Sequence, residues 1–409
     1  METSPALSRE HGERAAALLL QPASFLTLVL AVVLIACGRS PANVEQASPA
    51  PQLSGSAPPR SAADDLGRFL AGLPGDKASQ FTSLERKDGW NVHRRELDSL
   101  WRKVENEWLP AMRQFQKKEL SGLPAGTSLV FYPFSGPDVL MATVFFPDSP
   151  VYVMVGLEPA GTLPTPKQVA KGDLSKYLTE VRDSVSSELE RSFFITREMD
   201  REFRGQVTDG LLPPILLLLA RTHHTILGYQ YVRLDADGRV VERAADYKAP
   251  GRIGDKGVEI DFRSDANGPA QKLFYFSVNL SDERLRENKP FLAYLEELRG
   301  MTTFLKATSY MPHDPAFSII RDRVLVGSSV ILQDDSGIPY RFFDTAGWQV
   351  QLYGEYTRPY GSFRWREEPD LRKAYESGGA KPLGFHIGYG FSRVPSNLLL
   401  ARRKPAGSQ

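Results

Sequence analysis

Two acidic segments carry the side chains most able to do chemistry in this sequence. Residues 135–138 read Ser-Gly-Pro-Asp, and residues 334–336 read Asp-Asp-Ser. Carboxylates and imidazoles exchange protons in general acid–base catalysis, and carboxylates also bind divalent cations. With Glu158, which follows the apolar run over 151–155, and His313 added, the candidate catalytic residues are Asp138, Glu158, His313, Asp334, Asp335 and Ser336, and the candidate metal ligands are Asp334 and Asp335.

Each acidic segment also has a purely structural interpretation. His313, Asp314 and Ser336 would supply a base, an orienting group and a nucleophile if they met in space, but their spacing does not show that they meet. The run Asp-Asp-Ser-Gly is equally typical of a turn. Asp138 follows Pro137, where an acidic residue of the first helical turn belongs. Both interpretations stay open from the sequence.

The elements around these segments predict parallel strands. Residues 128–132 and 151–155 are apolar runs of strand length, and 138–146 predicts a short buried helix between them. Two strands joined by a helix predict a parallel pair with a right-handed crossover. Residues 329–333 predict a further strand, directly before the second acidic segment.

Ligands of open α/β sheets bind at the carboxyl ends of parallel strands. If the strands before the two acidic loops are parallel neighbours, the loops share one edge of the sheet. We therefore expect them to lie on the same side of the molecule and to flank a polar cleft. The carboxyl groups of Asp138 and Asp335 should then lie within roughly 15 Å of each other.

The remaining apolar patterns complete the predicted fold. An amphipathic stripe over 90–115, with Pro110 inside it, predicts an N-terminal helical segment. Further helices are predicted over 174–191, 196–204, 211–220, 282–298 and 315–326, and further strands over 226–234, 239–241, 257–263, 272–280 and 348–356. The fold class is therefore α/β, a mixed sheet with βαβ units covered by helices.

Composition excludes several classes of protein. The 409 residues are 42% hydrophobic, which is typical of a globular protein and excludes a disordered polyelectrolyte. Lys and Arg number 50 against 49 Asp and Glu, so the basic excess of a dedicated nucleic-acid binder is missing. No dinucleotide, nucleotide, zinc-protease, serine-hydrolase, iron or haem motif is present, and no cofactor is predicted.

The N-terminus indicates export. The apolar run over 25–36 is shorter than the roughly 20 residues that span a bilayer, and it ends at Cys37. Residues 1–36 therefore predict a signal peptide. Leu34-Ile35-Ala36-Cys37 resembles the lipobox of bacterial lipoproteins, which implies cleavage before Cys37 and acylation of its thiol with fatty acids such as palmitate. The alternative is an uncleaved anchor helix.

The rest of the chain agrees with an envelope location. Cys37 is the only cysteine, so the mature body would carry no thiol to pair wrongly in an oxidising compartment. Gly38 stands where the lipoprotein sorting pattern has Asp for inner-membrane retention, so the resemblance implies the outer membrane, facing the periplasm. Residues 37–62 predict a disordered Pro/Ser/Ala tether, and 63–404 predict a single α/β domain, with two packed lobes over about 63–250 and 251–404 as the alternative.

Three motifs in the body suggest a family. Residues 132–138, 156–159 and 333–339 resemble motifs of an uncharacterised family of bacterial envelope proteins, a resemblance that implies no activity. The sequence thus favours a lipoprotein held to the membrane by its acylated N-terminus, binding an envelope component or a partner protein. Candidate binding aromatics are Trp348, Tyr353, Tyr356, Tyr360 and Trp365. The alternative is a periplasmic hydrolase or transferase that uses loops 135–138 and 334–336.

Overall fold

The computed structural model describes residues 60–123, 129–191, 210–244, 256–264, 268–359, 361–390 and 395–405. Contacts divide the chain into residues 1–57 and 58–409, and every described residue lies in the second unit. The predicted signal peptide, Cys37, nearly all of the predicted tether, the predicted helix over 196–204 and Tyr360 lie outside the described residues.

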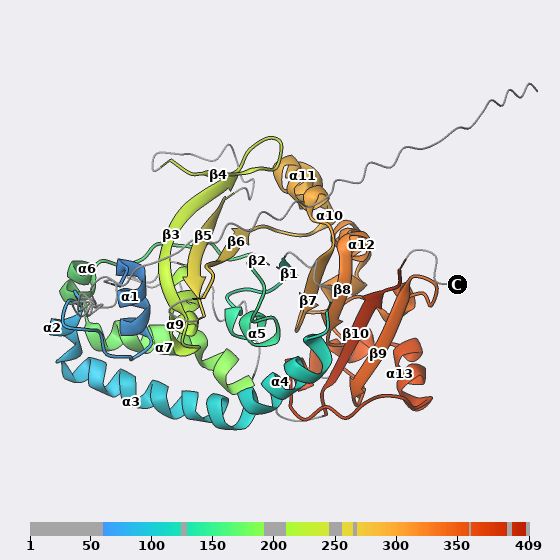
Figure 1. The fold of residues 1–409 in the computed structure, drawn as a ribbon, viewed down its shortest axis with the longest axis horizontal. Coiled ribbons are helices and arrows are strands. Elements are labelled where there is room, and N and C mark those ends of the chain that lie inside the picture. Colours follow the sequence, from blue (N-terminus) through green and yellow to red (C-terminus); the bar gives the residue numbers. More distant parts are fainter. Residues whose placement is uncertain are drawn as a thin grey trace, which may run out of the picture. The chain divides into compact units, whose positions relative to one another are not determined.

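A ten-stranded mixed sheet forms the centre of the fold (Figure 1), which confirms the predicted α/β class. Its strand order is β4-β3-β5-β6-β2-β1-β7-β8-β10-β9. The strands are β1 (Val130–Tyr132), β2 (Val151–Gly156), β3 (Thr225–Leu234), β4 (Val240–Glu242), β5 (Lys256–Arg263), β6 (Gln271–Ser277), β7 (Met301–Leu305), β8 (Ser328–Gln333), β9 (Trp348–Gly354) and β10 (Asn397–Arg403).

The five inner strands β6, β2, β1, β7 and β8 run parallel to one another. The strands outside them pair antiparallel on both sides. The predicted parallel pair formed by β1 and β2 is therefore confirmed, with Phe131 opposite Val153. Parallel strands are usually covered on both faces, and this sheet follows that rule.

Two separate apolar cores cover the two faces of the sheet. In β1, Val130 and Tyr132 belong to one core, whereas Phe131 belongs to the other, because successive side chains of a strand point to opposite faces. The first core includes residues of α1 (Ala62–Leu70), α3 (Asp88–Lys103), α4 (Leu109–Phe115), α5 (Val139–Phe145), α7 (Leu174–Arg191) and α9 (Leu212–Arg221). The second includes residues of α10 (Asp282–Glu287), α11 (Lys289–Glu297), α12 (Ser318–Gly327) and α13 (Pro369–Glu376).

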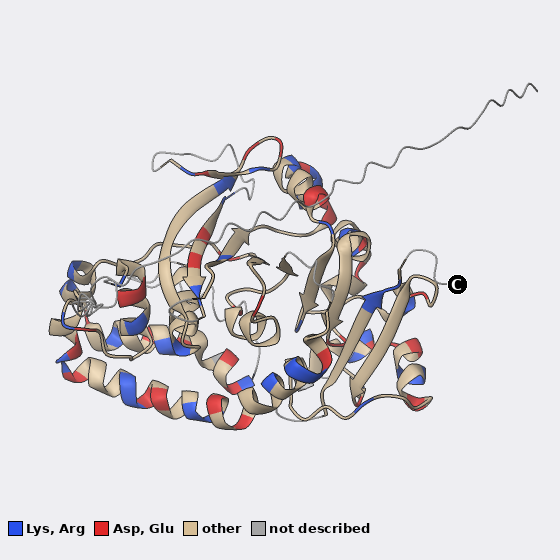
Figure 2. Ribbon diagram, viewed as in Figure 1, with Lys and Arg blue, Asp and Glu red and all other residues tan. Residues whose placement is uncertain are grey.

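Charged residues are absent from three inner strands and frequent on a covering helix. Strands β1, β2 and β7 carry no Lys, Arg, Asp or Glu, whereas helix α3 alternates both signs along its length (Figure 2). Two short helices, α2 (Thr82–Glu85) and α6 (Pro166–Lys171), complete the α-helices of the described residues. A charged side chain buried beside β1, β2 or β7 therefore needs a specific explanation.

The N-terminal helical segment is interrupted next to Pro110. Between α3 and α4 the chain forms a π-helical turn over Val104–Trp108, just before Pro110. Proline has no amide hydrogen and cannot continue the α-helical ladder, and an inserted π turn absorbs the break. A second π turn, Gln116–Leu120, ends the segment.

The prediction of one continuous helix over 282–298 is wrong. The stretch over 282–298 is two helices, α10 and α11, which are divided at Asn288. Pro290 follows two residues later, and its ring disfavours a helical conformation just before it. The Asn288 side chain accepts a hydrogen bond from the Phe291 amide at 3.2 Å, so it caps the second helix.

Candidate functional site

The two acidic loops follow strands that lie close together in the sheet. β1 pairs in parallel with β7, and β7 pairs in parallel with β8. The loops that follow these strands therefore share one edge of the sheet, as expected. The limit of roughly 15 Å between the Asp138 and Asp335 carboxyl groups stays a prediction.

The first acidic loop belongs to a sealed ionic cluster, which consists of Asp138, Glu188 and Lys306. The Lys306 ammonium lies 2.7 Å from Asp138 Oδ2 and 3.1 Å from Glu188 Oε1. The three side chains expose no more than 2% of their surface. Lys306 follows β7 directly and Glu188 lies on α7, so the cluster ties three distant parts of the chain together.

Asp138 has a structural role as well. Its Oδ1 accepts a hydrogen bond from the Met141 amide at 3.2 Å, so it is the N-cap of α5. Its Oδ2 accepts a second bond from the Tyr132 hydroxyl at 2.6 Å. The helix-cap interpretation of Asp138 is therefore right, and this carboxylate contacts Met141, Tyr132 and Lys306, which are all buried in the fold.

The protonation of the sealed ionic cluster follows from its charge count. Burial and the neighbouring charge of Asp138 raise the pKa of Glu188 to about 8, although Lys306 opposes this shift. Two carboxylates face one ammonium, so a proton on Glu188 leaves the cluster neutral at neutral pH. A neutral buried cluster avoids the large cost of an uncompensated charge.

The second acidic loop is held by its own hydrogen bonds. Asp334 accepts bonds from the amides of Ala307 (2.9 Å) and Ser336 (3.0 Å) and from the Ser336 hydroxyl. Asp335 accepts bonds from the Tyr310 hydroxyl at 2.6 Å and the Asn397 amide group at 3.1 Å. Burial and the charge of Asp335 raise the pKa of Asp334 to about 7.

Ser336 is not placed as a nucleophile. Its hydroxyl donates to Asp334 and accepts the Thr308 amide at 2.8 Å, and the residue is fully buried. Asp314 accepts bonds from the Ala316 amide and from Arg366 instead of orienting His313. The triad that the sequence left open is therefore not formed by these residues.

The loop after β7 is strained. Ala307, Ser309 and Tyr310 have φ values of 50°, 57° and 55°, in the left-handed region that residues with a Cβ rarely adopt. Bonds from the Thr308 amide to Ser336 and from the Ser309 amide to the Tyr389 hydroxyl (2.9 Å) hold this conformation. Such strain clusters at functional sites.

A cavity beside this loop has a volume of only about 20 Å³. It has room for about one water molecule. It is lined by Tyr310, Asp334, Asp335, Thr357, Arg358, Pro359, Ile387, Tyr389, Pro395, Ser396 and Asn397. The candidates Asp138 and Glu158 do not line it, so the five acidic and histidine candidates do not converge on this cavity.

A larger opening lies next to it. This open pocket has a volume of about 190 Å³ and is lined by His313, Arg341, Trp365, Arg366, Glu367, Glu368, Pro369 and Asp370. Of the candidate residues predicted for catalysis, only His313 lines it. Glu368 was missed by sequence reasoning, because nothing in its local sequence shows that it is 7% exposed.

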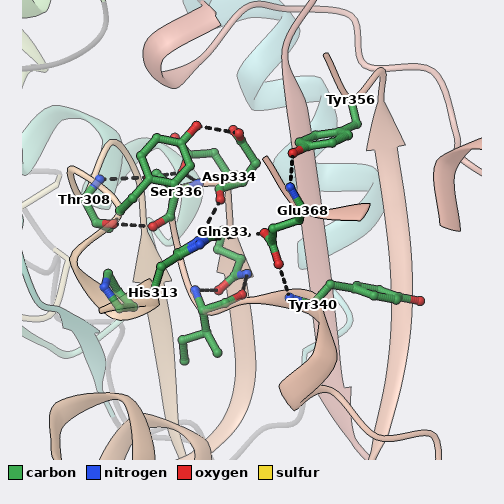
Figure 3. Close-up of polar contacts among 12 residues, drawn as sticks. Thr308, His313, Gln333, Asp334, Ser336, Tyr340, Tyr356 and Glu368 are labelled. Atoms are coloured by element: carbon green, nitrogen blue, oxygen red, sulfur yellow. Dashed lines mark hydrogen bonds and ion pairs between the residues drawn. The ribbon is translucent and has the colours of Figure 1, made fainter. Parts of the chain in front are cut away.

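Glu368 is held by one hydrogen bond to its side chain and one from its backbone amide (Figure 3). Its Oε2 accepts the Tyr340 amide at 2.8 Å, and its own amide donates to the Tyr356 hydroxyl at 2.9 Å. The His313 Nε2 atom lies 3.8 Å from Glu368 Oε1 and 3.2 Å from the Asp335 carbonyl oxygen. The pocket therefore shares its inner wall with the Asp334–Asp335 loop.

Burial makes the Glu368 carboxyl group and the His313 imidazole uncharged at neutral pH. Burial and the charge of Asp335 raise the pKa of Glu368 to about 8, and burial lowers the pKa of His313 to about 4. A protonated carboxyl and a neutral imidazole each offer one donor and one acceptor. The inner wall of the open pocket is therefore polar but uncharged.

The charges at the rim of the open pocket balance. Arg366 pairs with Asp314 at 3.2 Å, and Glu367 pairs with Arg358 and Arg372. Two other rim residues, Arg341 and Asp370, make no ion pair with any of the described residues. The rim thus contributes two cations and two anions to the pocket.

The predicted binding aromatics fall into different environments. Trp348 and Tyr353 are buried, at 4% and 1% exposure, and they do not form a ligand platform. Tyr356 is half-buried and bonds to the Glu368 amide. Trp365 alone among the described members of that set is exposed, at 66%, and it lies at the open pocket.

Glu158 lies apart from both openings. It follows β2, is 8% exposed, and its carbonyl oxygen accepts the Tyr275 hydroxyl at 2.8 Å. It does not line the small cavity or the open pocket. Neither the small cavity nor the open pocket is lined by both acidic loops, and loop 135–138 instead contributes Asp138 to the sealed ionic cluster.

Metal binding finds no support in the described part of the chain. Within it, no group of three or more His, Cys, Asp or Glu side chains could hold a metal ion. Asp334 and Asp335 would lack a third ligand of these types, and their oxygens already accept the bonds described above. The two carboxylates are arranged to receive hydrogen bonds from the protein.

Comparisons with protein-family models, curated proteins and solved structures found no match to this chain. Among the residues that the structure describes, none of the helices combines the length and the apolar character needed to cross a bilayer.

Proposed function

We propose that this chain is a membrane-anchored envelope lipoprotein whose α/β domain binds a small polar envelope component in the open pocket. The observation that supports this most is that solvent reaches the open pocket but not the side chains of the acidic loops. The open pocket has about 190 Å³ of space and charge-balanced walls, whereas Asp138, Asp334 and Ser336 are at most 3% exposed. A charge-balanced pocket with its functional groups already positioned suits binding better than turnover.

The anchor in this proposal is Cys37, acylated at the outer membrane with the domain facing the periplasm. The full chain should incorporate labelled palmitate and partition into detergent. Cys37→Ala should abolish both, whereas the neighbouring control Ser40→Ala should change neither. Unchanged labelling of Cys37→Ala would overturn the lipoprotein proposal.

The binding role is tested with the low-molecular-weight fraction of an envelope extract. A ligand that binds only the folded state raises the melting temperature, so the extract should raise that of the wild-type chain. Arg341→Ala and Asp370→Ala remove the two rim charges that have no ion-pair partner among the described residues, and both should reduce the rise. Val326→Ala is the control, since Val326 is 66% exposed on α12 and does not line the pocket. An equal rise in all variants would contradict binding in this pocket.

One observation favours a second candidate, a periplasmic hydrolase or transferase that uses the acidic loops. The pKa of Asp334 is raised to about 7 beside a strained backbone, as expected of a proton-transferring group. Under this alternative the wild-type chain would convert a component of the extract into a product that has gained the elements of water or a transferred group. Mass spectrometry would detect the product with the wild type and not with Asp334→Asn.

A further inference from the structure

We infer that the open pocket binds a neutral saccharide, one ring of which stacks on Trp365 while its hydroxyl groups bond to the charged rim. This inference rests on the proposed function and adds the chemical class of the ligand. It is carried by three observations: an exposed indole, a charge-balanced set of planar polar groups, and the size of the pocket.

Trp365 is the exposed indole. Its side chain is 66% exposed, whereas the other four tryptophans of the chain are between 2% and 7% exposed. One face of the indole is covered by the Arg366 guanidinium, 3.8 Å from the ring centroid. An exposed aromatic surface gains free energy when an apolar face covers it, and the C–H face of a sugar ring is flat and of suitable size.

The rim of the pocket offers planar groups in fixed orientations. Arg366 is held by Asp314, and Glu367 is held by Arg358 and Arg372. Guanidinium and carboxylate groups are forks of two parallel donors or acceptors. Neighbouring hydroxyl groups of a sugar can meet such forks, because each hydroxyl both donates and accepts.

The charge of the pocket argues for a neutral ligand. Among the residues that line the pocket, Arg341 and Arg366 are balanced by Glu367 and Asp370, so the lining itself attracts neither an anion nor a cation strongly. At the inner wall, burial raises the pKa of Glu368 to about 8 and lowers that of His313 to about 4. Both therefore present uncharged donors and acceptors, which suit hydroxyl or acetamido groups.

The size of the pocket fits a single sugar ring. Its volume of about 190 Å³ is below the roughly 300–1,000 Å³ of sites for drug-sized ligands. A longer glycan would place one ring in the pocket and extend along the surface. Binding of one ring with these few contacts should be weak, with a Kd of about 1 mM.

Tryptophan fluorescence of the full chain in detergent tests the inference. Acrylamide should quench mainly the exposed Trp365, and Trp365→Phe should remove that quenchable signal. N-acetylglucosamine, galactose and mannose are the neutral probes. At least one should protect Trp365 from acrylamide, and Arg341→Ala should weaken its binding about tenfold, whereas Val326→Ala should bind normally.

Two charged probes separate the outcomes. If glucuronate or D-alanyl-D-alanine protects Trp365 and the neutral sugars do not, the saccharide inference is wrong and pocket binding stands. If none of these probes protects Trp365 while the envelope extract still raises the melting temperature through Arg341 and Asp370, the ligand is of another class and the inference is again wrong. If the extract also has no effect, the proposed function fails with it. Equal binding of a sugar by wild type and Arg341→Ala would place the sugar elsewhere.

Discussion

The sealed ionic cluster and the open pocket use the same kinds of side chain for opposite purposes. In the cluster, Asp138, Glu188 and Lys306 pair with one another at 2% exposure or less. In the pocket, Arg341 and Asp370 face solvent with no ion-pair partner among the described residues, and the Glu368 side chain accepts the Tyr340 amide. Solvent access, and not residue type, therefore separates the charges that stabilise the fold from the charges that can contact a ligand.

The comparison predicts opposite responses to mutation. Removing one partner of a buried ion pair leaves an uncompensated buried charge and is strongly destabilising. Removing an exposed charge costs little stability. Variants in the sealed ionic cluster should therefore change the free energy of unfolding, and variants in the open pocket should change binding alone.

The largest expected effect belongs to Lys306→Met. The substitution leaves the Asp138 and Glu188 carboxyl groups without their cation, so it should lower the free energy of unfolding by about 3–5 kcal/mol. Urea denaturation followed by circular dichroism measures this. The matched control is Lys381→Met, because Lys381 pairs with Glu119 at 2.9 Å but is 45% exposed, and its loss should cost less than about 1 kcal/mol. If both variants lose the same free energy of unfolding, the buried ion pairs of Lys306 are no more important than the exposed pair of Lys381.

Tyr310→Phe should have the next largest effect. It removes the hydroxyl that donates to Asp335 at 2.6 Å and leaves a buried carboxylate short of one donor. The expected loss is about 1–3 kcal/mol in the free energy of unfolding, measured in the same urea titration. Tyr229→Phe, at an exposed tyrosine of β3, should be nearly neutral. If Tyr310→Phe leaves the free energy of unfolding unchanged, the hydrogen bonds to Asp335 add no stability.

Glu188→Gln should change how stability depends on pH. The pKa of Glu188 is raised from 4.5 to about 8 in the folded chain, so the folded state holds a proton that the unfolded state has lost. This contribution is fully present below about pH 4.5 and is lost as the pH rises toward 8. Glu188→Gln should reduce the downward slope in that window by up to about 1.4 kcal/mol per pH unit.

Urea denaturation at a series of pH values measures this slope. Glu190→Gln is the control, because Glu190 is an exposed residue of the same helix α7. Its slope should match that of the wild type. If Glu188→Gln also keeps the wild-type slope, Glu188 is ionised in the folded state and the sealed ionic cluster is not neutral.

The smallest effect on stability is expected for Trp365→Ala. The side chain is 66% exposed, so the free energy of unfolding should change by less than about 0.5 kcal/mol. The rise in melting temperature caused by the envelope extract should nevertheless be lost. A large loss of stability would show that Trp365 supports the fold, which would remove the strongest argument for a ligand at this face.

Much of the fold could be predicted because its signals are local. The apolar runs of β1 and β2, with Asp138 beginning the helix between them, show a βαβ unit within a short stretch of sequence. β7 was missed because Met301–Leu305 is a short run between a helix and a loop. β10 was missed because only its pairing with β8 and β9 brings its leucines into the sheet.

The site was harder to predict because its partners are distant in sequence. Glu188 and Lys306 are 118 positions apart, and neither has a local signal that reports the other. The lone lysine after the apolar run that ends at Leu305 was the one available hint, since a cation there follows a buried strand directly. The role of Glu368 depends on Tyr340 and Tyr356, and only tertiary structure brings these to it.

Hydrogen exchange of the full chain, with and without the envelope extract, shows where on the domain a ligand binds. If the open pocket binds the ligand, exchange should slow over residues 340–342 and 365–370 and stay unchanged over 138–142. Slower exchange over 138–142 with no change over 365–370 would place the ligand at the first acidic loop. That result would contradict the assignment of binding to the open pocket.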